Sequence, residues 1–303
     1  MKRVKKIISW ILIIFLGYLL ISRRTYILVQ LNYYLNGNTY DDIIVNEYNR
    51  NYDFAFVQNT DDFIPTSRQD LLNIYYSVIN SGNNSYTFLC PMEYTDCLEE
   101  VEFLAGDNKI ISTINNFVHP FNSFEMIETS YDNLGNVTIN VVKNYSADEI
   151  DKINKEIDRL IPLLVNDGYS NYDNIKNIHD YIINNTKYDI DRTDLGIINY
   201  QSHLAYGPLF EGYAICGGYT DLMYLFLERM DIKSYKVASE THTWNGLLLD
   251  NKWVHLDLTW DDPVTSTSVD VMIDDYFMLS TDELFEKEPK EHNFNPNYYR
   301  ELK

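Results

Sequence analysis

The chain has 303 residues, of which 45% are hydrophobic and 26 are tyrosines, so it can bury a full core as one or two globular domains. All six charged residues among the first 24 positions are basic, which leaves 18 basic against 45 acidic groups, a net charge of −27, on the remainder. A body this acidic is repelled by nucleic-acid phosphate, so DNA and RNA are excluded as partners.

Residues 1–24 predict a signal anchor, a single membrane helix that stays attached to the protein. Residues 7–21 carry no charge and lie between two basic clusters. Fifteen residues are fewer than the roughly 20 needed to span a bilayer, but flanking basic side chains can snorkel to the interface. No small-residue cleavage site follows, so an uncleaved anchor is favoured over a secreted form. The excess of basic groups before the apolar run predicts an extracellular body at the cell membrane.

Residues 25–145 predict a small extracellular α+β accessory domain without a motif that indicates chemistry. Residues 71–79 are apolar enough for a buried helix or strand, and both readings stay open. Residues 123–131 and 137–141 predict a hairpin around a turn at 132–136. Cys90 and Cys97 close a short loop, which in an oxidising compartment predicts a disulfide and leaves Cys216 as the odd thiol.

A second domain is expected over residues 146–303. Ser146 and Glu149 have the spacing of a capping box, and apolar residues then recur at helical period as far as Leu164. Residues 174–185 predict a second helix by the same periodicity.

Residues 212–230 predict a buried helix that begins near Cys216, because their apolar positions recur at helical spacing. Gly217 and Gly218 suit a first helical turn that another backbone approaches closely. The positive end of the helix favours a thiolate, and its free N–H groups can hold an oxyanion. The alternative is an inert, buried cysteine, which is common in protein cores.

Two extended runs meet at residues 250–252, which is good hairpin chemistry. A tight turn there places His242 and Asp257 opposite or diagonal on neighbouring strands, within contact distance. His242 could instead cap a strand and Asp257 could pair with a surface lysine. However, an acid between Leu256 and Leu258 needs a partner if it is buried. A thiol nucleophile needs a base, and the base needs an acceptor that fixes its tautomer, so Cys216, His242 and Asp257 together predict a catalytic triad.

Three motifs, AICGGY at 214–219, THTWNG at 241–246 and WVHLDLTWDD at 253–262, resemble the transglutaminase-like superfamily in its bacterial membrane-anchored or secreted form. The resemblance covers about residues 146–285. It implies a papain-like α+β core in which the nucleophile helix packs on an antiparallel sheet. It also implies that Cys216 is the nucleophile, His242 the general base and acid, and Asp257 the orienting residue.

The same resemblance implies structural hydrogen bonds for Asp261 and Asp262. Gly217 stands where animal transglutaminases place a tryptophan, and nothing resembles their calcium sites. The Cys216 N–H is one expected oxyanion donor, and the candidates for a second donor are Gln201, Tyr206 and Tyr219.

The remaining histidines are assigned no catalytic role; they are His119, His179, His203, His255 and His292. His255 could support Asp257 from the same face, although a solvated sheet residue is the favoured interpretation. No HExxH or CxxC spacing occurs, so neither a metal nor another cofactor is expected.

These features predict an extracellular, membrane-anchored cysteine enzyme that forms a thioester with a protein or peptide substrate, for which the cell envelope is one candidate source. Water or an amine then resolves the thioester, as in a cysteine peptidase or amidase or in a transglutaminase-like transferase. Hydrolysis is slightly preferred over transfer because water is abundant at an open site. The alternative is a non-catalytic cell-surface binding module that keeps the transglutaminase-like fold.

Overall fold

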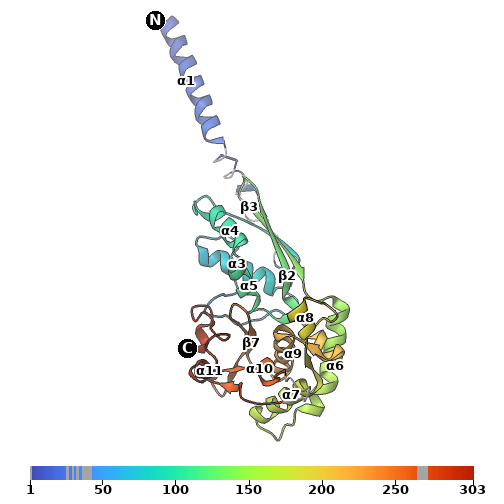
Figure 1. The fold of residues 1–303 in the computed structure, drawn as a ribbon. Helices are drawn as coiled ribbons and strands as arrows, with labels where there is room; N and C mark the ends of the chain where they lie inside the picture. The colour runs from blue at the N-terminus through green and yellow to red at the C-terminus, as the bar shows by residue number, and fades with distance from the viewer. Residues whose placement is uncertain (1, 25–26, 29–30, 32–33, 36–42, 265–271) are drawn as a thin grey trace.

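A computed structural model describes residues 2–24, 27–28, 31, 34–35, 43–264 and 272–303 (Figure 1). Helix α1 (Lys2–Ser22) extends away from the body of the protein in this view. Within the described ranges, no helix has the length and apolarity required for crossing a bilayer. The membrane helix predicted over residues 1–24 is therefore not supported: four of the first five residues of α1 are basic, and the uncharged run that follows is short.

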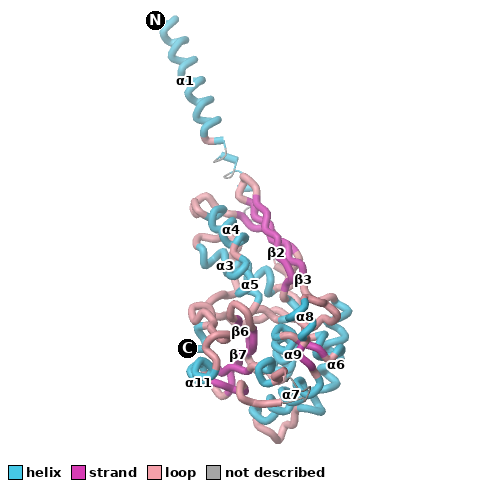
Figure 2. Tube along the Cα trace, viewed as in Figure 1, coloured by secondary structure: helices cyan, strands magenta, loops and turns pink. Residues whose placement is uncertain are grey.

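Residues 43–145 place helices beside a three-stranded antiparallel sheet of order β1-β3-β2 (Figure 2). The predicted hairpin is present as β2 and β3, and residues 71–79 lie in a helix. Cys90 forms the predicted disulfide with Cys97, the first residue of α4. The elements are α3 (Arg68–Asn80), β1 (Ser85–Leu89), α4 (Cys97–Gly106), α5 (Asn108–Asn115), η1 (Pro120–Asn122), β2 (Phe124–Tyr131) and β3 (Asn136–Lys143).

Two long helices follow, and their starts are fixed by serine caps. Helix α6 (Ala147–Leu164) begins at the predicted capping box, with both of its hydrogen bonds formed between Ser146 and Glu149. Helix α7 (Asn171–Asn185) starts three residues earlier than predicted, because the Ser170 hydroxyl accepts from the backbone N–H of Asp173 at 3.1 Å.

The rest of the chain forms an antiparallel sheet of order β6-β7-β8-β9 with α9 (Cys216–Arg229) packed on β6 and β7. Helices α6 and α7 contact α9, so the cysteine-bearing helix lies between the sheet and these helices (Figure 1). This arrangement agrees with the α+β layering that was expected. The strands are β6 (Ser234–Ala238), β7 (Thr243–Leu249), β8 (Lys252–Leu256) and β9 (Phe277–Leu279).

Short elements connect these layers. They are β4 (Lys187–Tyr188), α8 (Ile190–Leu195), η2 (Gly207–Glu211), β5 (Tyr213–Ala214), α10 (Leu258–Asp261), α11 (Thr281–Lys287) and η3 (Arg300–Leu302). Strands β4 and β5 pair in parallel, which brings Tyr188 beside Ala214, two residues before Cys216.

Two hydrophobic cores stabilise the body, and each contains residues from before and after residue 146. In the first core, the rings of Phe54 and Phe117 lie 5.5 and 5.3 Å from Tyr235 of β6. In the second, Phe121 and Tyr145 pack with residues of α6, α7 and α9. The buried Arg50 also joins the two parts, because its guanidinium donates to the carbonyl oxygens of Phe117 and Ser234. The predicted domain boundary at residue 146 thus stays a prediction. The parts of the chain before and after this residue contribute side chains to the same two hydrophobic cores.

Candidate active site

Cys216 is a free, half-buried thiol at the first residue of α9. The backbone of residues 202–204 passes directly behind it, and the Ile215 N–H donates to Ser202 O at 2.8 Å. A Cβ on Gly217 would lie 2.8 Å from His203 O, and a Cβ on Gly218 would lie 2.3 Å from Ser202 O. The close backbone approach predicted for this glycine pair is therefore confirmed.

His242 and Asp257 are brought together by the β7–β8 hairpin. Its two-residue turn places Asp250 and Asn251 at φ of 49° and 62°, as a tight primed turn requires. Asn245 pairs with Leu256, so His242 and Asp257 lie diagonally just beyond the paired residues, as predicted. One detail of the prediction is wrong, because the strand ends at Leu256 and does not continue through Asp257.

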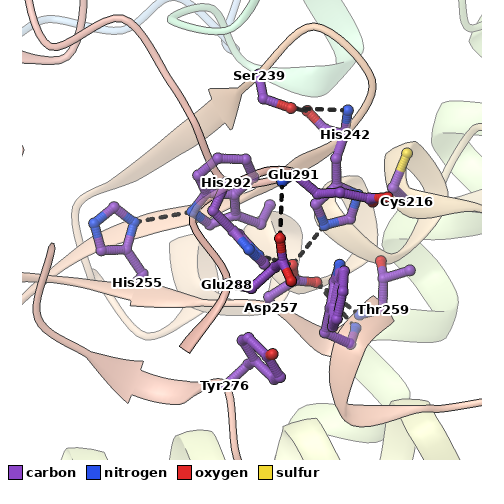
Figure 3. Close-up of polar contacts among 12 residues, drawn as sticks. Cys216, Ser239, His242, His255, Asp257, Thr259, Tyr276, Glu288, Glu291 and His292 are labelled. Atoms are coloured by element: carbon purple, nitrogen blue, oxygen red, sulfur yellow. Dashed lines mark hydrogen bonds and ion pairs between the residues drawn. The ribbon is translucent and has the colours of Figure 1, made fainter. Parts of the chain in front are cut away.

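Asp257 is the N-cap of α10, so its carboxylate has donors on both oxygens. Oδ1 accepts the backbone N–H groups of Thr259 at 2.9 Å and Trp260 at 3.3 Å. Oδ2 lies 2.5 Å from Nε2 of His242 and 2.9 Å from Nε2 of His292 (Figure 3). Burial raises the pKa of Asp257, but the two histidines outweigh it and hold the pKa well below its usual range. The carboxylate is therefore ionised at neutral pH.

His242 is a strongly basic imidazole next to the thiol. Burial lowers the pKa of His242, but the charge and hydrogen bond of Asp257, followed by those of Cys216, raise it to about 10. Because Nε2 faces Asp257, Nδ1 is the ring nitrogen left for the thiol. A cationic imidazole is the kind of partner that stabilises thiolates in general, and the fold places one beside this cysteine.

Trp244 and His255 pack beside the His242–Asp257 pair. The Trp244 indole stacks on the His242 ring at 5.6 Å and donates through Nε1 to Nδ1 of His255 at 2.9 Å. His255 Nε2 then donates to the Thr281 hydroxyl at 3.0 Å, and burial lowers the pKa of His255 to about 3. His255 is completely buried, so its interpretation as a solvated sheet residue is wrong. In its neutral form His255 holds Trp244, the tryptophan that stacks on His242, in place.

Asp261 and Asp262 make the structural contacts that the resemblance implied. Asp261 Oδ2 lies 3.1 Å from Nε2 of His179, and its Oδ1 accepts the Tyr276 N–H at 2.8 Å. The Tyr219 hydroxyl donates to Asp262. These bonds connect α10 to α7, α9 and the segment before β9.

Two of the three expected second oxyanion donors, Gln201 and Tyr219, are engaged elsewhere. Tyr219 is bound to Asp262, the Gln201 side chain hydrogen-bonds Glu149, and the Tyr206 ring packs on Phe210 at 4.8 Å. The sequence reasoning did not consider Tyr188, whose pKa is raised by burial and then by the charge of Cys216.

His292 is the other residue that the sequence reasoning missed. It is completely buried and bonds Asp257 across 35 residues of sequence. It lies in an irregular segment after α11, where no periodicity relates it to the hairpin. The other unassigned histidines are structural or peripheral: His119 bonds Glu228 at 3.0 Å, His179 bonds Asp261, and His203 is exposed.

His242, Asp257 and His292 offer ligand atoms that lie within 4.8 Å of one another, a donor set that Zn²⁺ could use. The contacts at 2.5 and 2.9 Å are hydrogen bonds that already occupy these atoms. We therefore interpret the group as a hydrogen-bonded network and derive no metal chemistry from it.

Comparison with known proteins finds no matching family model and no matching curated protein. Among solved structures, 48% of the chain is similar to 48% of one described as a TGase, at 14% identity and a TM-score of 0.32. A second solved structure, a candidate cysteine protease from Cytophaga hutchinsonii, is similar to 49% of this chain over 65% of its own length, at 16% identity and a TM-score of 0.28. The chain thus spans about half of the first protein and less than two thirds of the second. The chemistry proposed below rests on this chain's own side chains.

Proposed function

We propose that the protein is a cysteine-dependent acyl-transfer enzyme that acts on amide bonds of proteins or peptides. The observation that supports this function is the placement of Cys216 at the start of α9 beside His242, whose far nitrogen is bound to Asp257 at 2.5 Å. A buried Asp–His pair of this kind keeps the imidazole in one tautomer and stabilises its positive charge.

In the proposed reaction, Cys216 gives its proton to His242 Nδ1, and the sulfur attacks the substrate carbonyl carbon. The N–H groups at the first positions of α9 are not needed by the helix, so they can hold the oxyanion. His242 then protonates the leaving amine as the C–N bond breaks, which leaves a thioester on Cys216. Water or a second amine attacks the thioester, His242 accepts the proton, and the thiol is released. We prefer water as the acceptor because the thiol is only half-buried.

We also propose that the body of the protein works outside the cytoplasm. The disulfide between Cys90 and Cys97 supports this location, because disulfides persist mainly in oxidising compartments. Treating intact cells with a membrane-impermeant thiol reagent tests the location. Labelling of Cys216 before lysis is the expected result, and labelling only after lysis would contradict it.

The enzyme proposal is tested by intact-mass spectrometry after brief exposure to iodoacetamide at pH 6.5. We expect selective labelling of Cys216, at least about tenfold slower in His242→Ala and in Asp257→Asn, because both changes remove the stabilised thiolate. His179→Ala is the control, since that buried histidine bonds Asp261 instead of Asp257. An equal rate of Cys216 labelling in the native protein and in His242→Ala would favour a non-catalytic binding module.

A further inference from the structure

His292 holds the carboxylate of the proposed triad at the same oxygen as the catalytic imidazole. Its Nε2 lies 2.9 Å from Asp257 Oδ2, which His242 Nε2 reaches at 2.5 Å. The two imidazole rings are perpendicular, with centroids 5.4 Å apart. Because Oδ1 is fixed by backbone N–H groups of α10, His292 supplies the remaining donor that sets the direction of Oδ2.

The unpaired nitrogen of His292 indicates its protonation state. Among the described residues, Nδ1 is buried without a hydrogen-bond partner. A proton on that nitrogen would be a buried, unsatisfied donor, whereas a bare lone pair costs less. The ring therefore fits a neutral tautomer that carries its proton on Nε2 and donates it to Asp257.

Aromatic side chains hold the His292 ring in this position. Trp244 contacts it edge-on at 4.8 Å, Trp260 lies at 5.4 Å, and Tyr276 stacks on it at 5.5 Å. Such packing on several sides leaves the ring little freedom to rotate away from Asp257. The titratable groups that face His292 from the surrounding elements are Asp257, His242, His255, Tyr276 and Glu288.

We infer that His292 is a positioning residue for the proposed reaction: its Nε2–H fixes Asp257 Oδ2 on His242 Nε2 and so sustains the Cys216–His242 ion pair. The inference rests on the proposed function and extends the three-residue site to a fourth residue. His292 touches neither the thiol nor the substrate in this role. Its loss should alter the pH at which the thiolate forms.

The experiment measures the rate of Cys216 alkylation by iodoacetamide from pH 5 to 9. His292→Phe keeps a planar ring between the aromatic neighbours but removes the donor, and His292→Gln keeps an N–H donor. We expect His292→Phe to move the acid limb up by about one pH unit, which slows alkylation about tenfold at pH values below that limb. His292→Gln should stay within about threefold of the native rate, because its amide can replace the hydrogen bond. His119→Phe, a buried ring whose side-chain partner is Glu228, is the control for packing damage and should keep the native profile.

A His292→Phe profile that overlays the native one, in a protein whose alkylation depends on His242, would overturn this inference alone. Native alkylation that does not depend on His242 would overturn the proposed function and this inference with it. If His292→Phe does not fold, ¹⁵N NMR of the native protein at pH 7 can determine which ring nitrogen of His292 carries the proton. The signal of His292 is assigned by its absence in His292→Gln. A proton on Nε2 supports the inference, and a proton on Nδ1 contradicts it.

Discussion

At the scale of single residues, the contact between His242 and Asp257 decides how pH acts on the fold. The pKa of His242 is raised to about 10 in the folded protein, against about 6.5 when the ring is free. The folded state therefore binds a proton more tightly than the unfolded state does. The resulting stabilisation is complete below about pH 6.5 and is lost as the pH rises toward about 10.

We predict that the free energy of unfolding of the native protein falls more steeply between pH 6.5 and 10 than that of His242→Gln. The expected difference is a few kcal/mol, because both partners are buried. Urea unfolding of the two proteins at several pH values measures it. The comparison cancels lysine and tyrosine titrations that the two proteins share. A difference in unfolding free energy between the native protein and His242→Gln that grows with increasing pH would contradict this explanation.

At the scale of elements, the start of α9 depends on contact between two backbones. The segment at residues 202–204 occupies the space into which a side chain at Gly217 or Gly218 would project. Because the same turn holds Cys216, any shift that relieves a clash there also moves the sulfur.

Gly218→Ala should destabilise the protein by about 1–3 kcal/mol and slow the alkylation of Cys216. The new Cβ would lie 2.3 Å from Ser202 O, a backbone atom that cannot turn aside. Gly106→Ala is the matched control, since nothing lies within 4 Å of its Cβ position and alanine favours the helix. Thermal melting and alkylation rates compare the two variants. Equal effects from both would show that the close approach does not constrain the helix start.

Local patterns predicted the elements that depend on short-range signals. The capping box at Ser146, the glycine turn after Cys216 and the hairpin that joins His242 to Asp257 all follow from spacing along the chain. His292 could not be found in this way, because its contact with Asp257 depends on how an irregular segment returns to the sheet. The burial of His255 was missed for a related reason. The alternation of β8 indicated a face, but not that α11 covers it.

At the scale of the whole molecule, the first hydrophobic core combines residues 43–145 with the sheet that carries His242. Removing the N-terminal part would uncover Tyr235 and Tyr299, whose rings contact Phe54 and Phe117. At about 2 kcal/mol each, these two side chains amount to roughly 4 kcal/mol, a large share of the total stability of many domains.

A fragment of residues 146–303 is therefore expected to lack fixed tertiary packing, whereas a fragment of residues 43–303 should fold. Near-ultraviolet circular dichroism and binding of a hydrophobic dye compare the two. A shorter fragment with native dichroism and no dye binding would show that its core is sufficient without residues 43–145.

Trp244 belongs to this shared core and also stacks on the His242 ring. The N-terminal helices thus share one hydrophobic core with the tryptophan that stacks on the imidazole, although none of the proposed catalytic residues comes from them. Heating should consequently abolish the His242-dependent part of the Cys216 alkylation rate at pH 6.5 in step with the melting of those helices, so the reactivity of one sulfur atom reports on cooperativity between distant parts of the chain.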